Sequence, residues 1–537
     1  MQPRLVLSKE TGAFSWIGPA AQRSEPEAAG LTRSTKAHSS GGLLYYTADY
    51  SGKPVSNPYA VAHFAPIATP EAQARLAEIT AEIEASRSLG SNFEVPVPDG
   101  QELMPFQRSG IEYASRRRHA LIGDDMGLGK TVQGLGFCNL VKAKRVLVLC
   151  PAAVRLQWRV MAHRWMLGKP LVHILASGKH GVHPHARLVV CSYDTARNPA
   201  VAAALASQSW DVVLLDECHY LKNHDAQRTV AILGGYRDGS PEGVLVNAGH
   251  VIGLTGTPLP NRPRECYTIT RALCWDTIEY QSEDQFRFRY NSSTMLGNGH
   301  NLEQVGRLPE LQNRLRANFM VRRLKSEVLT QLPAKSYEIV QVDSAGTRKV
   351  VAAERILEIP DNAWQDADAL FGGNLAQLRK EMGIAKAPLA ADYLRVLLSG
   401  GDKVFAVAHH LEVLRALKEE LAEFEPVGVS GATSTAGRMA AVKRFQDDPK
   451  CSLFLGQIKA VGTGVDGLQQ VCSRVVFIEP SWTPGENEQC ADRLHRHGQV
   501  DAVQVDFLVA PGSLDERVLS RVVEKLRHTD AALDKRF

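Results

Sequence analysis

Short hydrophobic runs alternate with stretches of helical spacing along most of the chain. The first series comprises ALI (120–122), RVLVLC (145–150), ARLVVCSY (186–193), WDVVLLDE (210–217) and VIGLTGT (251–257). A second series comprises DKVFAVAHH (402–410), PVGVSG (426–431), CSLFLGQI (451–458), CSRVVFIEP (472–480) and VQVDFLV (503–509). Continuous apolar runs of this kind are typical of strands that are buried on both faces. Each series therefore predicts a parallel α/β sheet.

The segments outside the two series complete the domain plan. Residues 1–95 combine Ser/Gly/Pro-rich joints with short aromatic stretches such as LLYYT, which indicates a small accessory domain that we expect to take part in substrate recognition. Within it, TPEAQARLAEITAEIEASR predicts a helix over about 70–87. Residues 262–400 are mostly helical in character. The predicted domains are 1–95 (accessory), 96–265 (first lobe), 266–400 (helical insert and inter-lobe segment), 401–525 (second lobe) and 526–537 (tail).

Composition and charge exclude several classes of protein. With 62 Lys and Arg residues against 58 Asp and Glu, the formal charge is +4, which excludes a uniformly basic nucleic-acid binder. The nine cysteines are scattered without a CxxC pair, which argues against a disulfide framework or a zinc ribbon. No run approaches the roughly 18 apolar residues of a membrane span, and no signal-peptide core follows the first residues. We therefore expect a reducing compartment and no membrane association.

A glycine-rich turn between a buried strand and a helix predicts a phosphate site. In LIGDDMGLGKT (121–131), Gly127 and Gly129 let backbone N–H groups close around phosphate oxygens, and Asp125 lies in the same turn. Lys130 can reach the β- and γ-phosphates, and Thr131 can ligate Mg²⁺. The segment departs from the strict GxxxxGK[ST] pattern because its first position is Asp124. We predict bound ATP and Mg²⁺ here.

Two carboxylates at the end of a later strand complete the hydrolytic group. Asp216 and Glu217 end the run VVLLDE. Hydrolysis of a nucleoside triphosphate needs one carboxylate for the metal and another to position or deprotonate water. We assign Asp216 to Mg²⁺ and Glu217 to water.

Two further segments carry nucleotide-directed side chains. Phe106 and Gln107 lie just before the phosphate-binding strand, and an amide can pair with both the amino group and a ring nitrogen of adenine. Near the end, QCADRLHRHGQ (489–499) places Arg493 and Arg496 three residues apart, on one face if helical. Such guanidinium groups suit the charge that develops on a γ-phosphate, although a solvated basic face is the alternative.

In this order the motifs resemble superfamily 2 helicase-like ATPases of the Swi/Snf type. MPFQ (104–107) is similar to the adenine-reading Q motif, and DDMGLGKT (124–131) to motif I, where this family commonly has Asp first. The further similarities are LVLCPAAVRLQW (147–158) to motif Ia, DECH (216–219) to motif II, LTGTPLPN (254–261) to motif III, MVRRLKSEVLTQLPAK (320–335) to the segment between the lobes, AVGTGVDGL (460–468) to motif V and QCADRLHRHGQ to motif VI. PSWTPGENEQCADRLHRHGQ and TGTPLPNRPRECY look most like the HepA-related annealing-helicase branch.

The resemblance implies a fold and an activity. It implies an α/β fold with two RecA-like parallel-sheet lobes, helical insertions and the small N-terminal domain, with ATP between the lobes. It also implies a DNA translocase, driven by ATP hydrolysis, that remodels or reanneals duplex or forked DNA during replication, recombination or repair. The alternatives are a strand-separating DNA or RNA helicase and a nucleotide-gated binding switch. We expect DNA rather than RNA, replication or repair proteins as partners, a monomer, and a location in the bacterial or phage-infected cytoplasm at the nucleoid, or in a eukaryotic nucleus.

The nucleic-acid contacts follow from local charge and from the same resemblance. Residues 309–335 carry six basic and two acidic residues, a surplus equal to that of the whole chain. The candidates in it are Arg314, Arg316, Arg322, Arg323 and Lys325; a solvated surface is the alternative. The predicted DNA-binding set comprises Arg155, Thr255, Thr257, Arg322, Arg323 and Trp482, and Gly464 of motif V is assigned to the nucleotide. Asp466 places a carboxylate in the same loop, which puts a DNA contact there in doubt.

Overall fold

A computed structural model of the chain describes residues 2–9, 13–22, 24–28, 31–34, 43–47, 57–176, 181–234, 243–259, 263–278, 282–290, 293–295, 301–303, 308–356, 373–462 and 464–520. The contacts divide the chain into two compact units. The described residues of 1–125 and 129–328 belong to the first unit, and those of 126–128 and 329–526 to the second. None of the described helices combines the length and apolar character that a membrane span requires.

The N-terminal part of the first unit contains an antiparallel sheet with strand order β1-β2-β4-β3. Its strands are β1 (Arg4–Leu7), β2 (Phe14–Gly18), β3 (Thr32–Arg33) and β4 (Leu43–Tyr46), and its helical elements are η1 (Ala20–Gln22), α1 (Ser24–Ala28), α2 (Pro58–Val61), η2 (Ala62–Ile67) and α3 (Pro70–Arg87). Trp16 and Tyr45 pack edge to face in a core that includes Leu76 of α3. Helix α3 spans the range predicted from its apolar spacing, with proline at its first position.

A parallel sheet with strand order β13-β5-β10-β9-β6-β8-β7 forms the framework of the first lobe. Its strands are β5 (His119–Ile122), β6 (Val146–Cys150), β7 (Val172–Leu175), β8 (Leu188–Ser192), β9 (Trp210–Asp216), β10 (Ala248–Leu254) and β13 (Met320–Val321). All five apolar runs of the first series are strands, so the predicted parallel sheet is confirmed.

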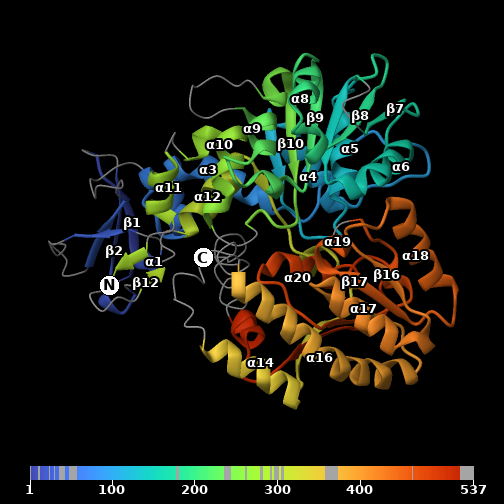
Figure 1. Ribbon diagram of the computed structural model, residues 1–537. Coiled ribbons are helices and arrows are strands. Elements are labelled where there is room, and N and C mark those ends of the chain that lie inside the picture. Colours follow the sequence, from blue (N-terminus) through green and yellow to red (C-terminus); the bar gives the residue numbers. More distant parts are fainter. Residues whose placement is uncertain are drawn as a thin grey trace. The chain divides into compact units, whose positions relative to one another are not determined.

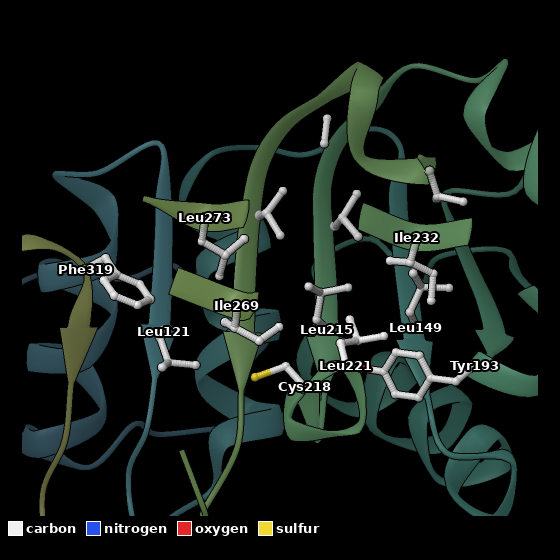
Figure 2. Packing of buried hydrophobic residues seen from close by; sticks show 14 of the residues in the cluster. Leu121, Leu149, Tyr193, Leu215, Cys218, Leu221, Ile232, Ile269, Leu273 and Phe319 are labelled. Atoms are coloured by element: carbon white, nitrogen blue, oxygen red, sulfur yellow. The ribbon is translucent and has the colours of Figure 1, made fainter. Parts of the chain in front are cut away.

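Helices cover both faces of this sheet (Figure 1), as continuous apolar strands require. Helices α4 (Pro105–Ser115), α5 (Lys130–Leu140) and α6 (Arg155–Trp165) contribute to the core on one face. On the other face lie α7 (Tyr193–Ala196), α8 (Pro199–Ala206), α9 (Gln227–Leu233), α10 (Tyr267–Leu273) and α12 (Leu308–Asn318). Figure 2 shows this second core, where Leu121 and Leu215 of the strands lie beside Ile269 and Leu273 of α10.

Shorter elements complete the first unit. They are η3 (Ala152–Val154), η4 (Cys218–Leu221), η5 (Val244–Asn247), η6 (Pro263–Cys266), η7 (Trp275–Ile278), α11 (Glu283–Tyr290), β11 (Ser293–Met295), β12 (Asn301–Glu303) and α13 (Lys325–Val328). A buried charge cluster fixes α11 to α12. Glu310 accepts hydrogen bonds from Arg289 Nε (2.9 Å), Arg314 Nε (2.7 Å) and the Tyr290 hydroxyl (2.9 Å). Burial alone would raise the pKa of Glu310, but the two guanidinium groups outweigh it and lower the pKa to about 2.

The second lobe is a parallel sheet with strand order β14-β19-β18-β15-β17-β16. Its strands are β14 (Lys335–Gln341), β15 (Val404–Ala408), β16 (Val427–Val429), β17 (Leu453–Gln457), β18 (Arg474–Phe477) and β19 (Val503–Val509). Its helical elements are α14 (Ala345–Ile356), α16 (Gly373–Ser399), α17 (Leu411–Glu420), η9 (Ala422–Phe424), α18 (Thr435–Asp447), α19 (Ile458–Val461), η10 (Leu468–Gln470) and α20 (Pro484–Ala491). Helices α16 and α17 contribute to one buried cluster, and α18, α19 and α20 to the other. The five runs of the second series are its strands β15 to β19.

The segment 266–400, predicted as a helical insert and inter-lobe segment, contributes one strand to each of the two parallel sheets. Strand β13 pairs with β5 in the first sheet, and β14 pairs with β19 in the second sheet. Neither strand has a continuous buried run, because β13 is two residues long and most of β14 is exposed. The first lobe therefore continues past the predicted boundary at residue 265, to residue 328.

Candidate active site

The glycine-rich turn joins the end of β5 to the start of α5. Gly127 and Gly129 have φ angles of +84° and +72°, a region that residues with a side chain rarely adopt. A Cβ atom on Gly129 would lie only 2.5 Å from Gln107 Nε2. Gln107 Oε1 in turn accepts a hydrogen bond from the N–H of Met104 (3.0 Å), which fixes the amide at the start of α4. The predicted adenine-reading residue thus lies directly against the predicted phosphate loop.

A buried ion pair explains why the first position of the loop is an aspartate. Asp124 and Arg323 are both fully buried, and Arg323 Nη2 lies 2.5 Å from Asp124 Oδ2. Asp124 Oδ1 also accepts from Nε (2.9 Å) and the backbone N–H (3.0 Å) of Arg323, and Gln133 Nε2 of α5 donates to Oδ2 (2.8 Å). Arg323 Nη1 donates to the carbonyl of Phe106 in α4. Arg323 therefore connects the Q-motif helix, the loop and α5.

Lys130 is held over the backbone of the same turn. Its ammonium donates to the carbonyl oxygens of Asp124 (2.9 Å) and Asp125 (3.1 Å). The surrounding protein desolvates the ammonium and lowers its pKa, whereas nearby carboxylates, Glu217 first among them, act in the opposite direction. Thr131, the predicted metal ligand, follows as the second residue of α5 and is partly exposed. A bound phosphate would replace the carbonyl partners of this lysine.

Asp216 ends β9 with its carboxylate fixed by an indole. Trp158 Nε1 of α6 donates to Asp216 Oδ2 (2.7 Å), and the Tyr193 hydroxyl donates to the Asp216 carbonyl (2.7 Å). Desolvation raises the pKa of Asp216 to about 7, and the negative charge of Glu217 acts in the same direction. Lys130 is one positive charge near Asp216 and Glu217, and a second positive charge there would stabilise the ionised form of both carboxylates. The carboxylate of Asp216 therefore fits the predicted role as an oxygen ligand of Mg²⁺.

Glu217 is linked to the end of β10 through one histidine. It has a φ of +49°, which is strained for a residue with a side chain. Glu217 Oε2 lies 3.2 Å from His219 Nδ1 and 3.4 Å from Thr255 Oγ1. His219 Nδ1 is 2.9 Å from Thr255 Oγ1 and 3.3 Å from Thr257 Oγ1, and the Thr257 N–H donates to Thr255 Oγ1 (3.1 Å). A shift of the loop after β10 would therefore move the partners of Glu217.

Arg322 and Arg323, which the sequence assigns to DNA, are buried in the first lobe. Arg322 is 7 % exposed, pairs with Asp125 (3.2 Å) and donates to the carbonyl of Gly123 (2.7 Å), while Arg323 has no exposed surface. Arg314, Arg316 and Lys325 of the same segment are also buried, so five of its six basic side chains are folded into the first lobe. Neither guanidinium group is exposed in this structure, and the assignment of Arg322 and Arg323 as DNA contacts stays a prediction.

The remaining candidates are divided between the two lobes. Arg155, the first residue of α6, is partly exposed and donates through Nε to the carbonyl of Ala152 (3.1 Å). Trp482 is 2 % exposed in the second lobe, and its assignment as a DNA contact stays a prediction. Gly464 has a φ of +82°, which suits the tight turn of motif V.

Motifs V and VI interlock within the second lobe. Arg493 donates to the carbonyl oxygens of Val465 (2.9 Å) and Gly462. Arg496 Nη1 lies 2.6 Å from Asp466 Oδ1 and forms an ion pair with it. The unusual aspartate of motif V thus neutralises a motif VI arginine, and Arg496 would have to leave Asp466 to meet a phosphate.

Sequence reasoning about single positions missed three side chains of the first lobe's site. Trp158 and His219 lay inside quoted motifs, but an indole or an imidazole in a motif gives no sign of the carboxylate that it contacts. Gln133 stands one helical turn beyond Gly129 and carried no signal, because its partners Asp124 and Arg323 become visible only after folding.

Comparisons with known proteins agree with this geometry. Residues 106–351 match the SNF2-related domain, and residues 389–498 match the helicase conserved C-terminal domain. The DNA annealing helicase and endonuclease ZRANB3 of Homo sapiens is 30% identical over 454 residues, which are 81% of this chain and 41% of that protein. A SWI/SNF-related matrix-associated actin-dependent regulator of chromatin, subfamily A-like protein 1, of Xenopus laevis is 32% identical over 443 residues, 79% of this chain and 43% of that protein.

The chain thus spans about two fifths of the length of the curated relatives that it matches. A solved structure, the SWI2/SNF2 ATPase core of Sulfolobus solfataricus in complex with dsDNA, is 17% identical with a TM-score of 0.39, over 83% of this chain and 99% of that one. With an SNF2-related domain and a helicase C-terminal domain in order along two parallel-sheet lobes, the chain belongs to the Swi/Snf family of superfamily 2 helicase-like ATPases.

Proposed function

We propose that this protein is an ATP-dependent translocase that acts on duplex or forked DNA and remodels or reanneals its strands. The observation that carries the proposal is the linkage of Glu217, through His219, to Thr255 and Thr257. Glu217, which is proposed to activate water, is thereby connected to the loop after β10, which is proposed to contact a second ligand. The relatives named as a DNA annealing helicase support DNA as that ligand and reannealing as the outcome.

The residues of the first lobe take separate roles in hydrolysis. Lys130 leaves the carbonyl oxygens of the loop to hold the β- and γ-phosphates, and the Gly129 turn allows close approach of the backbone. Asp216 and Thr131 would hold Mg²⁺, which supplies charge neutralisation for the phosphates. Glu217 orients and deprotonates the attacking water. Gln107, beside the same turn, reads the adenine ring.

In this proposal the second lobe supplies two arginines that stabilise the negative charge developing on the γ-phosphate. Arg493 and Arg496 are presented from the end of α20, where their present partners are backbone carbonyls and Asp466. Binding of ATP would draw both lobes onto the nucleotide, and hydrolysis would release them, so that one lobe advances along the DNA backbone. Arg155, Thr255 and Thr257 are among the proposed DNA contacts of the first lobe.

The test is the rate of ATP hydrolysis by the full chain on four nucleic acids: single-stranded DNA, duplex DNA, forked DNA and RNA. We expect duplex and forked DNA to raise the rate most. Lys130→Ala and Glu217→Gln should each lower the stimulated rate by roughly 100-fold or more, because each removes a group that acts on the reacting phosphate. Lys349→Ala, a change at an exposed lysine of α14, is the matched control and should leave the rate unchanged. Absence of stimulation by any DNA would refute the proposal.

The two alternatives give different results in the same experiment. A strand-separating helicase would be activated best by single strands and would unwind a tailed duplex instead of closing a bubble. A nucleotide-gated switch would show background turnover while ATP changed its affinity for DNA, and Glu217→Gln would then have no effect on it.

A further inference from the structure

A basic cavity lies at the edge of the first sheet opposite to the phosphate loop. It has a volume of about 390 Å³ and is lined in part by Lys142, Lys144, Arg145, His185 and Arg187. These residues precede β6 and β8, whereas the phosphate loop and Asp216 follow the carboxyl ends of β5 and β9. Five residues of strand separate the two edges, which is roughly 16 Å. The cavity is therefore distinct from the hydrolytic site.

The two arginines form the fixed wall of the cavity. Arg145 Nη1 donates to the carbonyl oxygens of Pro184 (2.9 Å) and Ala186 (2.8 Å), and Arg187 donates to those of Ala143 (2.9 Å) and Leu167 (2.5 Å). Neutral carbonyl oxygens hold these guanidinium groups in place without cancelling their charge. The described residues that line the cavity include no acidic side chain.

One carboxylate lies close to this wall. Asp211, at the start of β9, accepts the backbone N–H groups of Lys144 (2.7 Å) and Arg145 (2.9 Å) through Oδ2. Four cationic side chains therefore line the cavity, and the nearby carboxylate is bound by backbone N–H groups. Neither the Lys142 nor the Lys144 ammonium has a hydrogen-bond or ion-pair partner in the part of the chain that the structure describes.

The backbone at Lys142 is a second, independent observation. The residue directly follows the C-cap of α5, Val141, and has a φ of +52°, while its N–H donates to the carbonyl of Asn139 (3.1 Å) and that of Ala143 donates to the carbonyl of Cys138 (2.9 Å). Helices that end in this pattern usually have glycine at the left-handed position. A lysine there is strained, and strain of this kind is retained where the side chain has a function. Lys169, with a φ of +46°, repeats the feature after Gly168, whose Cβ position lies 3.8 Å from Arg187 Nη1.

We propose that this cavity binds phosphate groups of a nucleic-acid backbone, as a contact separate from the ATP-hydrolysing edge of the lobe. A carboxylate ligand is bound best by a guanidinium group whose N–H donors are free. Here the guanidinium groups of Arg145 and Arg187 already donate to carbonyl oxygens, so a carboxylate is not the favoured ligand. The available groups are the ammoniums of Lys142 and Lys144, which bind phosphate as point charges. The inference rests on the proposed action on DNA and adds a second place where a DNA segment is held.

The experiment measures the affinity of the full chain for forked DNA, without nucleotide, across a range of KCl concentrations. The test variant is Lys142→Gly with Lys144→Gln, and the control is Lys349→Gln with Lys418→Gln, which removes two exposed lysines of the second lobe. We expect the slope of log affinity against log salt to fall by about 1.8 in the test variant, since each phosphate contact contributes about 0.9. The control should keep the slope of the unmodified chain.

Thermal unfolding separates this effect from damage to the fold. Lys142→Gly removes the backbone strain, so the melting temperature of the test variant should not fall. If it does fall, Lys144→Glu alone, which leaves the end of α5 intact, decides the matter by a fall in the slope of about 0.9, the contribution of one phosphate contact. An unchanged slope in a folded variant, or an equal loss in the control, would overturn the proposal.

Inorganic phosphate distinguishes the source of the ligand. If it raises the melting temperature of the unmodified chain but not of the test variant, and the DNA slope is the same in both, the cavity binds a free anion and the nucleic-acid assignment is wrong. The proposed function fails separately, because it is decided by stimulation of ATP hydrolysis in the unmodified chain.

Discussion

The pair of Asp124 and Arg323 offers the sharpest test of how the first lobe is held together. Both side chains are fully buried, and three Arg323 nitrogen atoms contact Asp124 at 2.5 to 3.0 Å. Replacing Arg323 with Met would leave the carboxylate with the Gln133 amide and the backbone N–H of residue 323, but without the guanidinium group. Breaking a buried ion pair in this way costs about 3 to 5 kcal/mol. Asp124→Gly, which restores the usual first glycine of the loop, should cost a similar amount because it strands the guanidinium.

The double variant should be much less destabilised than the two single changes together. Neither charge is then left alone, and we expect a coupling energy of about 2 to 3 kcal/mol. The assay is urea unfolding followed by a signal from the first lobe, combined with the affinity for a fluorescent ATP analogue. ATP affinity should fall in both single variants, because Arg323 also binds the carbonyl of Phe106 beside Gln107.

The matched control is an arginine in a pair at the surface. Arg348 and Asp343 are 71% and 50% exposed, so Arg348→Met should leave the unfolding midpoint in place. Additivity of Arg323→Met and Asp124→Gly to within about 0.5 kcal/mol would refute the reasoning. So would a loss in Arg323→Met no larger than that in Arg348→Met.

Three further predictions follow from buried groups and glycines. Burial raises the pKa of Glu354 to about 7, so the fold loses stability as the pH rises from about 4.5 to 7. Above pH 7, Glu354→Gln should therefore be more stable than the unmodified chain by up to about 3 kcal/mol. Urea titrations near pH 4 should show no difference between the two proteins. The pKa of Glu310 is lowered to about 2, so the stability that its ionised carboxylate contributes is present above about pH 4.5 and is lost toward pH 2. Glu310→Gln should lower the free energy of unfolding by about 3 kcal/mol at neutral pH, and this difference should vanish on acidification. Gly129→Ala should abolish measurable ATP-analogue binding because its Cβ would meet Gln107 at 2.5 Å, whereas Gly100→Ala, at a φ of +77° with nothing within 4 Å, should lose stability alone.

Each of these has an outcome that contradicts it. A pH-independent difference for either glutamate variant would mean that the carboxyl group does not titrate as described. Equal loss of ATP-analogue binding in Gly129→Ala and Gly100→Ala would mean that backbone strain, and not contact with the adenine-reading amide, explains the first result.

Ten strands of the two parallel sheets were predictable because apolar runs that are buried on both faces leave a clear pattern, whereas β7, β13 and β14 were not among the predicted runs. The run 145–150 became β6 at Val146–Cys150, one residue shorter. The run 251–257 was displaced, since β10 begins at Ala248 and ends at Leu254. The start of β10 was missed because Gly249 and His250 are not apolar residues. The end of the run was placed too late because Thr255 lies beyond the strand, where its hydroxyl contacts His219.

The burial of basic residues within 309–335 was missed for a different reason. A surplus along the sequence predicts a surface only if no opposite charge is folded against it. The partners of Arg322 and Arg323 lie 197 and 199 residues upstream, beyond any local pattern. The pair of Arg314 with Glu310, one helical turn away, was visible in the sequence, but its complete burial was not.

The dependence of the phosphate loop on Arg323 has a consequence for biosynthesis. The chain reaches Asp124 early, but the buried partner of that aspartate is 199 residues further on. Strand β13, which pairs with β5, is made at the same late point. At ordinary elongation rates of about 5 to 20 residues per second, the nascent loop waits roughly 10 to 40 s for both. The nucleotide site therefore matures on the ribosome only after the whole first lobe has emerged, and a chain truncated before residue 323 would carry every residue of motif I without a folded loop.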